Sequence, residues 1–183
     1  SRDWSSDVCS SDLTSSTIIT YDVQNGIWEK LMEIPLEIKQ HRSSEHPVLL
    51  GKGCILEDIV YVPIFNANEV LALDLRDNTY MIHTVGDENA KYGLAATYAG
   101  NIWLAPSLGG PLVVWHPSTG AMQVVDQFPR DFAYENVIGR DETRFFADSL
   151  VCGKYWWLLP ACAKQILRVD MESGDIQTIV CGG

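Results

Sequence analysis

The stretch "NIWLAPSLGGPLVVWHPSTGAMQV", residues 101–124, consists of three short apolar runs separated by turn residues. The first run ends at Pro106, the second ends at His116, and the third follows Gly120. Short apolar runs bounded by Pro, Gly and Ser are typical of consecutive antiparallel strands. The stretch therefore predicts three strands of one small sheet.

The same pattern occurs twice more, in residues 58–82 and 154–178, and its second half occurs in residues 16–31. The first apolar run ends in Pro63, Pro106 or Pro160, which gives repeat spacings of 43 and 54 residues. One further apolar segment precedes each of these runs, at 47–56, 93–100 and 145–152. Four short strands in about 40–50 residues are typical of a β-propeller blade.

We therefore predict an all-β fold, a partial β-propeller with about three and a half four-stranded antiparallel blades of a larger ring. The half blade is expected at 16–32 and the full blades at about 47–85, 93–128 and 145–180. Runs that are apolar at every position, such as 155–159, fit strands covered on both faces by neighbouring sheets. Because an open arc leaves a blade face uncovered at each end, we expect the fragment to self-associate through these faces.

A recurring turn supports the repeat. Three residues separate Asp22 from Gly26, Asp74 from Asn78, His116 from Gly120, and Asp170 from Gly174. An Asp carboxylate can accept backbone N–H groups in such a turn, and Gly or Asn tolerates the positive φ that closes it. The aspartates fall one to a blade in separate hairpins, so we interpret them as structural and not as calcium ligands.

The run "GNIWLAP", residues 100–106, resembles the Gly-x-Ile-Trp run of streptogramin-lyase-type propellers, and residues 16–181 resemble kelch-type and streptogramin-lyase-type blades in general. Kelch repeats carry a Gly-Gly pair at the end of the second strand, where this chain has Pro; its nearby pair, Gly109-Gly110, occurs in a single blade. The lyase-type propellers use a His and acidic cluster with magnesium, which does not match this chain residue by residue. The resemblance implies the propeller fold and carries over no catalytic role.

Residues 3–13, "DWSSDVCSSDL", resemble a translated DNA sequencing adapter. The segment has no apolar period of 2 or 3.6 residues, so nothing in it predicts a strand or a helix. We interpret residues 1–13 as an artefactual or disordered leader, a natural Ser/Asp-rich leader being the alternative. Residues 14–183 are then the propeller fragment.

The composition limits the partners. The formal net charge is −11, and the 170 residues after the leader keep 21 acidic against 12 basic side chains. An acidic chain without a Lys/Arg run argues against nucleic acid, and no apolar stretch reaches the 18 residues of a membrane span. After the leader, no two cysteines lie close enough in sequence to form a CxxC pair; they are Cys54, Cys152, Cys162 and Cys181. This spacing favours reduced thiols and a cytoplasmic location, with export of the protein as the alternative.

No cofactor or metal site is expected. His41, Glu45 and His46 lack the helical spacing of a zinc motif, and Gly51-Lys52-Gly53 lacks the spacing of a phosphate-binding loop. No Gly-x-Ser-x-Gly elbow is present. We therefore assign no catalytic residue.

A candidate ligand site lies where the loops between blades meet the innermost strands. His46, Lys91 and Arg144 precede those strands and are predicted to ring the mouth of the central channel. The neighbours that could complete a pocket are Phe65, Asn66, Asn68, Tyr92, Tyr134 and Arg140. On an acidic molecule, a cationic ring favours an anionic ligand. For residues 130–144 the sequence leaves two interpretations, a short helix or a lid.

These observations favour a non-catalytic binding module that holds a peptide, protein or glycan ligand, anionic if the ring forms, on the face with the inter-blade loops. The alternative is a propeller lyase or hydrolase whose catalytic cluster lies partly in other blades. Binding is favoured because no carboxylate pair, triad or metal cluster is found in the three full blades.

Overall fold

The computed structural model describes residues 17–22, 24–41, 49–65, 67–107, 110–129, 132, 146–161 and 165–180. They form one two-stranded and three four-stranded antiparallel sheets, which we call blades 1 to 4 in chain order. Blade 1 contains β1 (Thr17–Asp22) and β2 (Ile27–Glu33), and the one-turn helix α1 (Leu36–Lys39) follows it. Blade 2 contains β3 (Cys54–Leu56), β4 (Ile59–Pro63), β5 (Glu69–Asp74) and β6 (Thr79–Thr84). Blade 3 contains β7 (Tyr92–Tyr98), β8 (Asn101–Pro106), β9 (Leu112–Trp115) and β10 (Met122–Val125). Blade 4 contains β11 (Phe146–Cys152), β12 (Tyr155–Pro160), β13 (Ile166–Asp170) and β14 (Ile176–Ile179).

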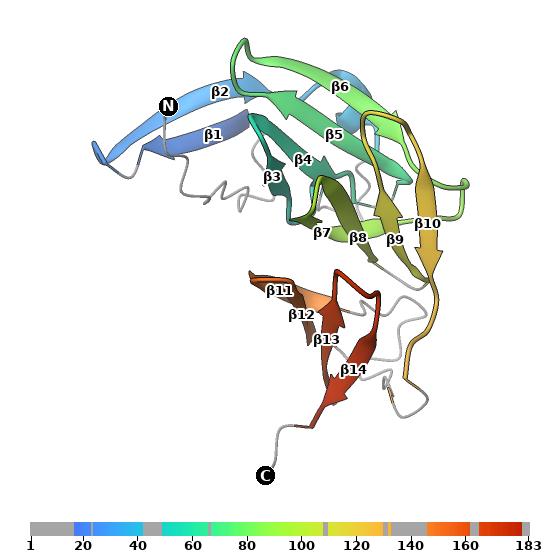
Figure 1. Ribbon diagram of the computed structural model, residues 1–183. Coiled ribbons are helices and arrows are strands. Elements are labelled where there is room, and N and C mark those ends of the chain that lie inside the picture. Colours follow the sequence, from blue (N-terminus) through green and yellow to red (C-terminus); the bar gives the residue numbers. More distant parts are fainter. Residues whose placement is uncertain are drawn as a thin grey trace.

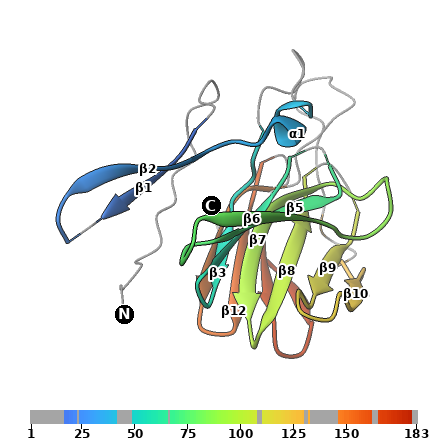
Figure 2. The ribbon, with the colours of Figure 1, turned by 90° about the horizontal axis from the view of Figure 1, so that it is seen from above.

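The blades stand side by side in an arc (Figure 1). The first strands of the full blades, β3, β7 and β11, lie on the inner side of the arc, and the last strands, β6, β10 and β14, lie on the outer side. Seen from above, the β1–β2 hairpin projects away from the full blades (Figure 2). The arrangement confirms the all-β class and the partial β-propeller.

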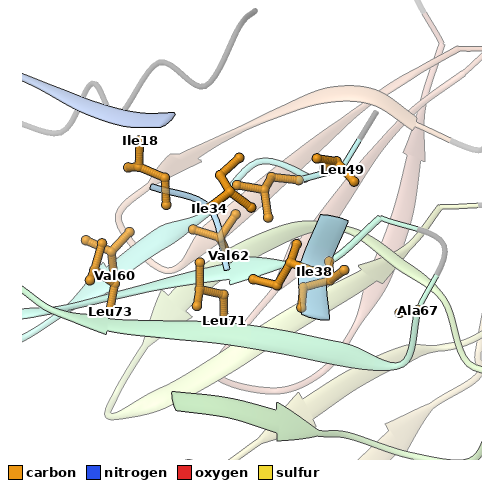
Figure 3. Close-up of a cluster of buried hydrophobic side chains, with 11 residues drawn as sticks. Ile18, Ile34, Ile38, Leu49, Val60, Val62, Ala67, Leu71 and Leu73 are labelled. Atoms are coloured by element: carbon orange, nitrogen blue, oxygen red, sulfur yellow. The ribbon is translucent and has the colours of Figure 1, made fainter. Parts of the chain in front are cut away.

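Alternate residues of each strand pack against the two neighbouring blades. In β8, Ile102 and Leu104 belong to the apolar cluster between blades 2 and 3, and Trp103 belongs to the cluster between blades 3 and 4. Between blades 1 and 2, Val60 and Val62 of β4 pack with residues of β1, β5, α1 and the segment between α1 and β3 (Figure 3). Strands with both faces buried explain the continuous apolar runs of the sequence.

The strand register corrects the alignment of the three prolines. Tyr61 pairs with Ala72, Trp103 with Val114, and Trp157 with Arg168. This register makes Ile64, and not Pro63, equivalent to Pro106 and Pro160. Pro63 lies 11 residues before Asp74, whereas Pro106 and Pro160 lie 10 residues before His116 and Asp170. The one-residue slip accounts for this difference, because the proline of blade 2 lies one position earlier in its strand.

The same register places Tyr61, Trp103 and Trp157 at one equivalent position, the third residue of the second strand. Tyr61 and Trp103 are buried against the following blade, with exposed fractions of 5% and 4%. Trp157 is on the face of blade 4 that no described blade covers. There the Arg168 guanidinium lies 5.8 Å from the centre of the Trp157 indole and 4.7 Å from that of the Tyr155 ring.

The innermost segment of blade 2 is a shorter strand than the sequence predicts. Only Cys54–Leu56 is regular, because the chain before it leaves the sheet and approaches blade 3. Lys52 forms a parallel bridge with Leu94: its N–H donates to the Gly93 carbonyl at 2.9 Å, and its carbonyl accepts from Ala95 N–H at 2.8 Å. The inner strands of blades 2 and 3 are thereby joined directly.

The outer turns have the predicted construction. The Asp22 carboxylate accepts the N–H groups of Gln24 and Asn25 at 2.9 and 3.0 Å. The residues that close the four turns all have positive φ, namely Gly26, Asn78, Gly120 and Gly174 at 68°, 59°, 71° and 82°. The aspartates therefore serve their own turns, as expected for a structural role.

The inner turns also need positive φ, and Ala99 supplies it at 50°. In an L residue other than Gly, this conformation destabilises the folded state by about 1–2 kcal/mol. Gly avoids that strain but lowers the free energy of unfolding by about 0.4–1 kcal/mol, because it gives the unfolded chain more conformational entropy. We therefore expect Ala99→Gly to raise the free energy of unfolding by about 0.5–1 kcal/mol in urea denaturation. The control Ala121→Gly, at an exposed position without positive φ, should lower it by about 0.5 kcal/mol. A loss of stability with Ala99→Gly would show that this turn is not strained.

Candidate functional site

The structure describes four of the nine predicted site residues, Phe65, Asn68, Lys91 and Tyr92, and the Asn68 side-chain amide donates to the Gly86 carbonyl at 3.4 Å. The other five, His46, Asn66, Tyr134, Arg140 and Arg144, lie outside the described residues, as does all of the 130–144 segment except residue 132. The predicted cationic ring is thus represented by Lys91 alone, which directly precedes β7.

Phe65, which follows β4 of blade 2, and Lys91, which precedes β7 of blade 3, lie at the same end of neighbouring blades. The Phe65 N–H donates to the Leu49 carbonyl at 2.8 Å, and the Ser107 N–H donates to the Lys91 carbonyl at 2.9 Å. Gly93 brings the two sites together, because a Cβ placed on it would lie 3.3 Å from Phe65 Cε2 and 3.2 Å from Ser107 Cβ.

Tyr92 is placed differently from its neighbours. Its side chain is buried between blades 2 and 3, with an exposed fraction of 2%. Its hydroxyl donates to the Val85 carbonyl at 3.2 Å, and burial raises its pKa to about 12. Tyr92 thus packs the blade interface in this structure.

A charged pair crosses the inner side of the arc. Lys52 Nζ lies 2.7 Å from Asp148 Oδ1 and also donates to the Ser149 carbonyl. Lys52 comes from the segment before β3 and Asp148 from β11, so the pair joins the innermost segments of blades 2 and 4 across blade 3. Both side chains are about half exposed, at 47% and 56%, so solvent and a ligand can reach them.

The pair keeps unused hydrogen-bonding capacity. A lysine ammonium has three N–H donors, of which Lys52 uses two. Asp148 Oδ1 accepts from Lys52 and from the Ser149 N–H at 2.7 Å, while no hydrogen bond to Oδ2 is found among the described residues. The hydrogen bond from Lys52 lowers the pKa of Asp148 from its ordinary 3.8. Since the carboxylate is the form that this bond favours, the pair is complete above the ordinary pKa of 3.8 and is lost only as the pH falls through the lowered pKa of Asp148.

A cavity of about 540 Å³ adjoins the pair. Such a volume is typical of a small-ligand pocket. Its polar lining includes Lys52, Thr97, Ser149 and Cys54, and burial raises the pKa of the Cys54 thiol to about 12, which makes it a poor nucleophile. The apolar lining comes from β1 and β2 (Ile18, Leu31), the 50–55 segment, β4 and β5 (Val60, Val62, Leu73), β7 (Ala95, Ala96) and β11 (Leu150, Val151).

The sequence prediction missed Lys52 and Asp148. We considered Lys52 only as part of a Gly-Lys-Gly segment and did not single out Asp148. The positive-φ turns after the inner strands would have revealed both, because Lys52, Leu94 and Asp148 each lie five residues before Glu57, Ala99 and Gly153. Opposite charges at two of these equivalent positions are the signal for a pair, while the third residue, Leu94, packs in the apolar cluster between blades 3 and 4.

In the described part of the chain, no group of three or more His, Cys, Asp or Glu side chains is placed to hold a metal ion. Within the same ranges, no helix has the length and apolar character needed to cross a membrane.

Solved structures with a propeller-type fold resemble this chain. Virginiamycin B lyase from Staphylococcus aureus matches 92% of the chain and 50% of its own length, with a TM-score of 0.56 and 11% identity. A catalytically inactive form of that lyase with quinupristin matches 91% and 49%, with a TM-score of 0.56 and 15% identity. An extracellular domain from B. thetaiotaomicron matches 90% and 20%, with a TM-score of 0.53 and 12% identity.

At these identities the likeness establishes the propeller fold alone. The chain spans about half the length of the lyase structures. No protein-family model and no curated protein sequence matches it. The kelch-type resemblance stays a prediction.

Proposed function

We propose that this chain is part of a propeller that acts as a non-catalytic binding module and holds a peptide, protein segment or glycan in its central channel. The observation that carries the proposal is the half-exposed Lys52–Asp148 pair beside the cavity. The pair offers a donor and an acceptor side by side, which suits a ligand with neighbouring acceptor and donor groups. Peptide amides and sugar hydroxyls both have this property.

Phe65 and Lys91, at the loop end of blades 2 and 3, are proposed as further ligand contacts. Lys91 would add a cationic contact at the channel mouth. The preference for an anionic ligand depends on His46 and Arg144 as well, and it stays a prediction. The Lys52–Asp148 pair is itself neutral overall, so it favours a ligand for its hydrogen-bonding groups and not for its net charge.

Peptide and glycan arrays probed with the full chain test this function. We expect binding on one of the two arrays, and Lys52→Met or Asp148→Asn should weaken the bound probe by about 10–100-fold, the loss expected for one or two hydrogen bonds to charged groups. The matched control is Lys30→Met, which removes a lysine that pairs with Glu33 on the surface of β2. No binding on either array, or equal losses with Lys30→Met and Lys52→Met, would refute the proposal.

A further inference from the structure

A second cavity, of about 580 Å³, lies between blades 2 and 3 at the end of the blades that carries the tight turns. Such a volume is typical of a small-ligand pocket. We call it the turn-side cavity. It shares no lining residue with the cavity beside the Lys52–Asp148 pair. Phe65 and Lys91 lie at the opposite ends of the same blades, so this cavity is separate from the proposed channel site.

Tyr61 of β4 brings a buried polar group to the turn-side cavity. The residue is 5% exposed, and its ring packs edge-on against Trp115 with 5.8 Å between ring centres. The Tyr61 hydroxyl has no hydrogen bond to any described residue. Because a phenol hydroxyl both donates and accepts hydrogen bonds, it is available to a molecule in the cavity.

The charged groups of the cavity are acidic, since no Lys or Arg is among its described lining residues. The Asp74 carboxylate accepts from Arg76 Nε at 2.9 and 3.2 Å, so its charge is compensated. Glu57, at the β3–β4 turn, is exposed and has no hydrogen bond or ion pair among the described residues. Burial raises the pKa of Tyr61, and the Cys54 thiol and the Glu57 and Asp74 carboxylates raise it further. Glu57 therefore supplies an uncompensated negative charge close enough to act on the Tyr61 hydroxyl.

Two histidines add hydrogen-bonding groups from the outer part of the cavity. Burial lowers the pKa of His83, so its imidazole is largely neutral at pH 7 and can accept a hydrogen bond. His116, on the blade 3 side, uses Nδ1 for Ser118 Oγ at 3.1 Å. Apolar lining comes from Leu56, Ile59, Ala72 and Met81.

We propose that the turn-side cavity binds a small organic amine, whose ammonium group is held by the Glu57 carboxylate and the Tyr61 hydroxyl and whose apolar part lies against Ile59 and Met81. An ammonium has three N–H donors, and its hydrogen bond to a carboxylate is of the strong, charge-assisted kind. A divalent metal ion would find too few ligands, because no group of three His, Cys, Asp or Glu is placed to hold one among the described residues. This proposal does not rest on the proposed function.

Three probes of nearly equal shape separate charge from shape. Phenethylamine, 2-phenylethanol and 3-phenylpropionate are titrated into the full chain at pH 7 by calorimetry, and NMR follows the histidine imidazole signals. We expect one amine to bind per chain, about 10-fold more tightly than the alcohol, and 3-phenylpropionate not to bind. The signals of His83 and His116 should shift, while that of His41, which pairs with Glu69, should not.

Variants test the two proposed contacts. Glu57→Gln should weaken amine binding about 10-fold and leave alcohol binding unchanged, because it removes the charge and keeps the shape. The matched control is Glu88→Gln, since Glu88 is exposed in the loop before β7 and does not line the cavity. Tyr61→Phe should weaken amine binding about 3–10-fold, the effect of one hydrogen bond, while the ring stays against Trp115.

Absence of amine binding, equal affinity for the three probes, equal losses with Glu57→Gln and Glu88→Gln, or shifts confined to His41 would overturn the proposal. Lys52→Met should leave amine binding unchanged, because Lys52 does not line this cavity. The failure of the channel function and the failure of this proposal are thereby distinguished.

Discussion

Replacing Trp103 by Ala should lower the free energy of unfolding by about 3–5 kcal/mol, the usual cost of emptying a large buried aromatic site. Trp103 is buried between blades 3 and 4, where it belongs to a cluster with Trp156, Leu158 and Leu167. Truncation leaves a cavity between two rigid sheets, which cannot close around it without breaking their strand pairing. Urea denaturation followed by circular dichroism measures the loss.

Trp157→Ala is the matched control for this prediction. Trp157 has the same position in its strand, but it lies on the face of blade 4 that no described blade covers, and the Arg168 guanidinium lies 5.8 Å from its ring centre. Its truncation should cost only about 1 kcal/mol, because it leaves no closed cavity. Equal losses for the two variants would mean that blade 4 is covered by a partner in solution, as the predicted self-association through exposed blade faces requires.

Replacing Gly51 by Ala should have an effect at least as large. A Cβ on Gly51 would lie 2.1 Å from the Gly93 carbonyl oxygen and 2.8 Å from its carbon. Both are backbone atoms that cannot rotate away, so the inner segments of blades 2 and 3 must separate and lose the Lys52–Gly93 and Lys52–Ala95 hydrogen bonds. We expect a loss of more than about 4 kcal/mol, or no folded protein at all.

Two controls separate this contact from other effects of adding a small side-chain group. Ala147, the equivalent residue of blade 4, is exposed, and Ala147→Ser should change stability by less than about 0.5 kcal/mol. Gly153 has positive φ but no atom within 4 Å of an added Cβ, so Gly153→Ala should cost about 1 kcal/mol from backbone strain alone. If Gly51→Ala unfolds within 1 kcal/mol of the parent, the inner segments are not in contact.

The sequence predicts the strands and turns of this protein well because both are local properties. Apolar runs bounded by Pro and Gly indicated the strands, and the Asp–Gly spacing indicated the outer turns. The exceptions have a tertiary cause. The segment before Cys54 is apolar enough for a longer strand, but Gly51 and Gly53 allow it to leave its own sheet and bond to blade 3.

The candidate site was harder to predict for the same reason. Lys91 and Phe65 were singled out because they lie in loops, where ligand contacts were sought, and their role stays a prediction. Tyr92 was taken as a loop neighbour, yet it begins β7 and points into a blade interface. Side chains along a strand alternate between the two faces of the sheet, so a shift of one residue in the strand register moves each side chain to the opposite face.

The amino-acid sequence by itself determined that this chain forms repeated four-stranded units, since strand length, turn chemistry and apolar periodicity are encoded within a few residues. Only the tertiary structure decided that Lys52 meets Asp148, 96 residues away, and that Tyr61 and Glu57 of blade 2 share a cavity with His116 of blade 3. Both depend on strand register and on the packing of one sheet against the next, which bring together residues that no local pattern connects.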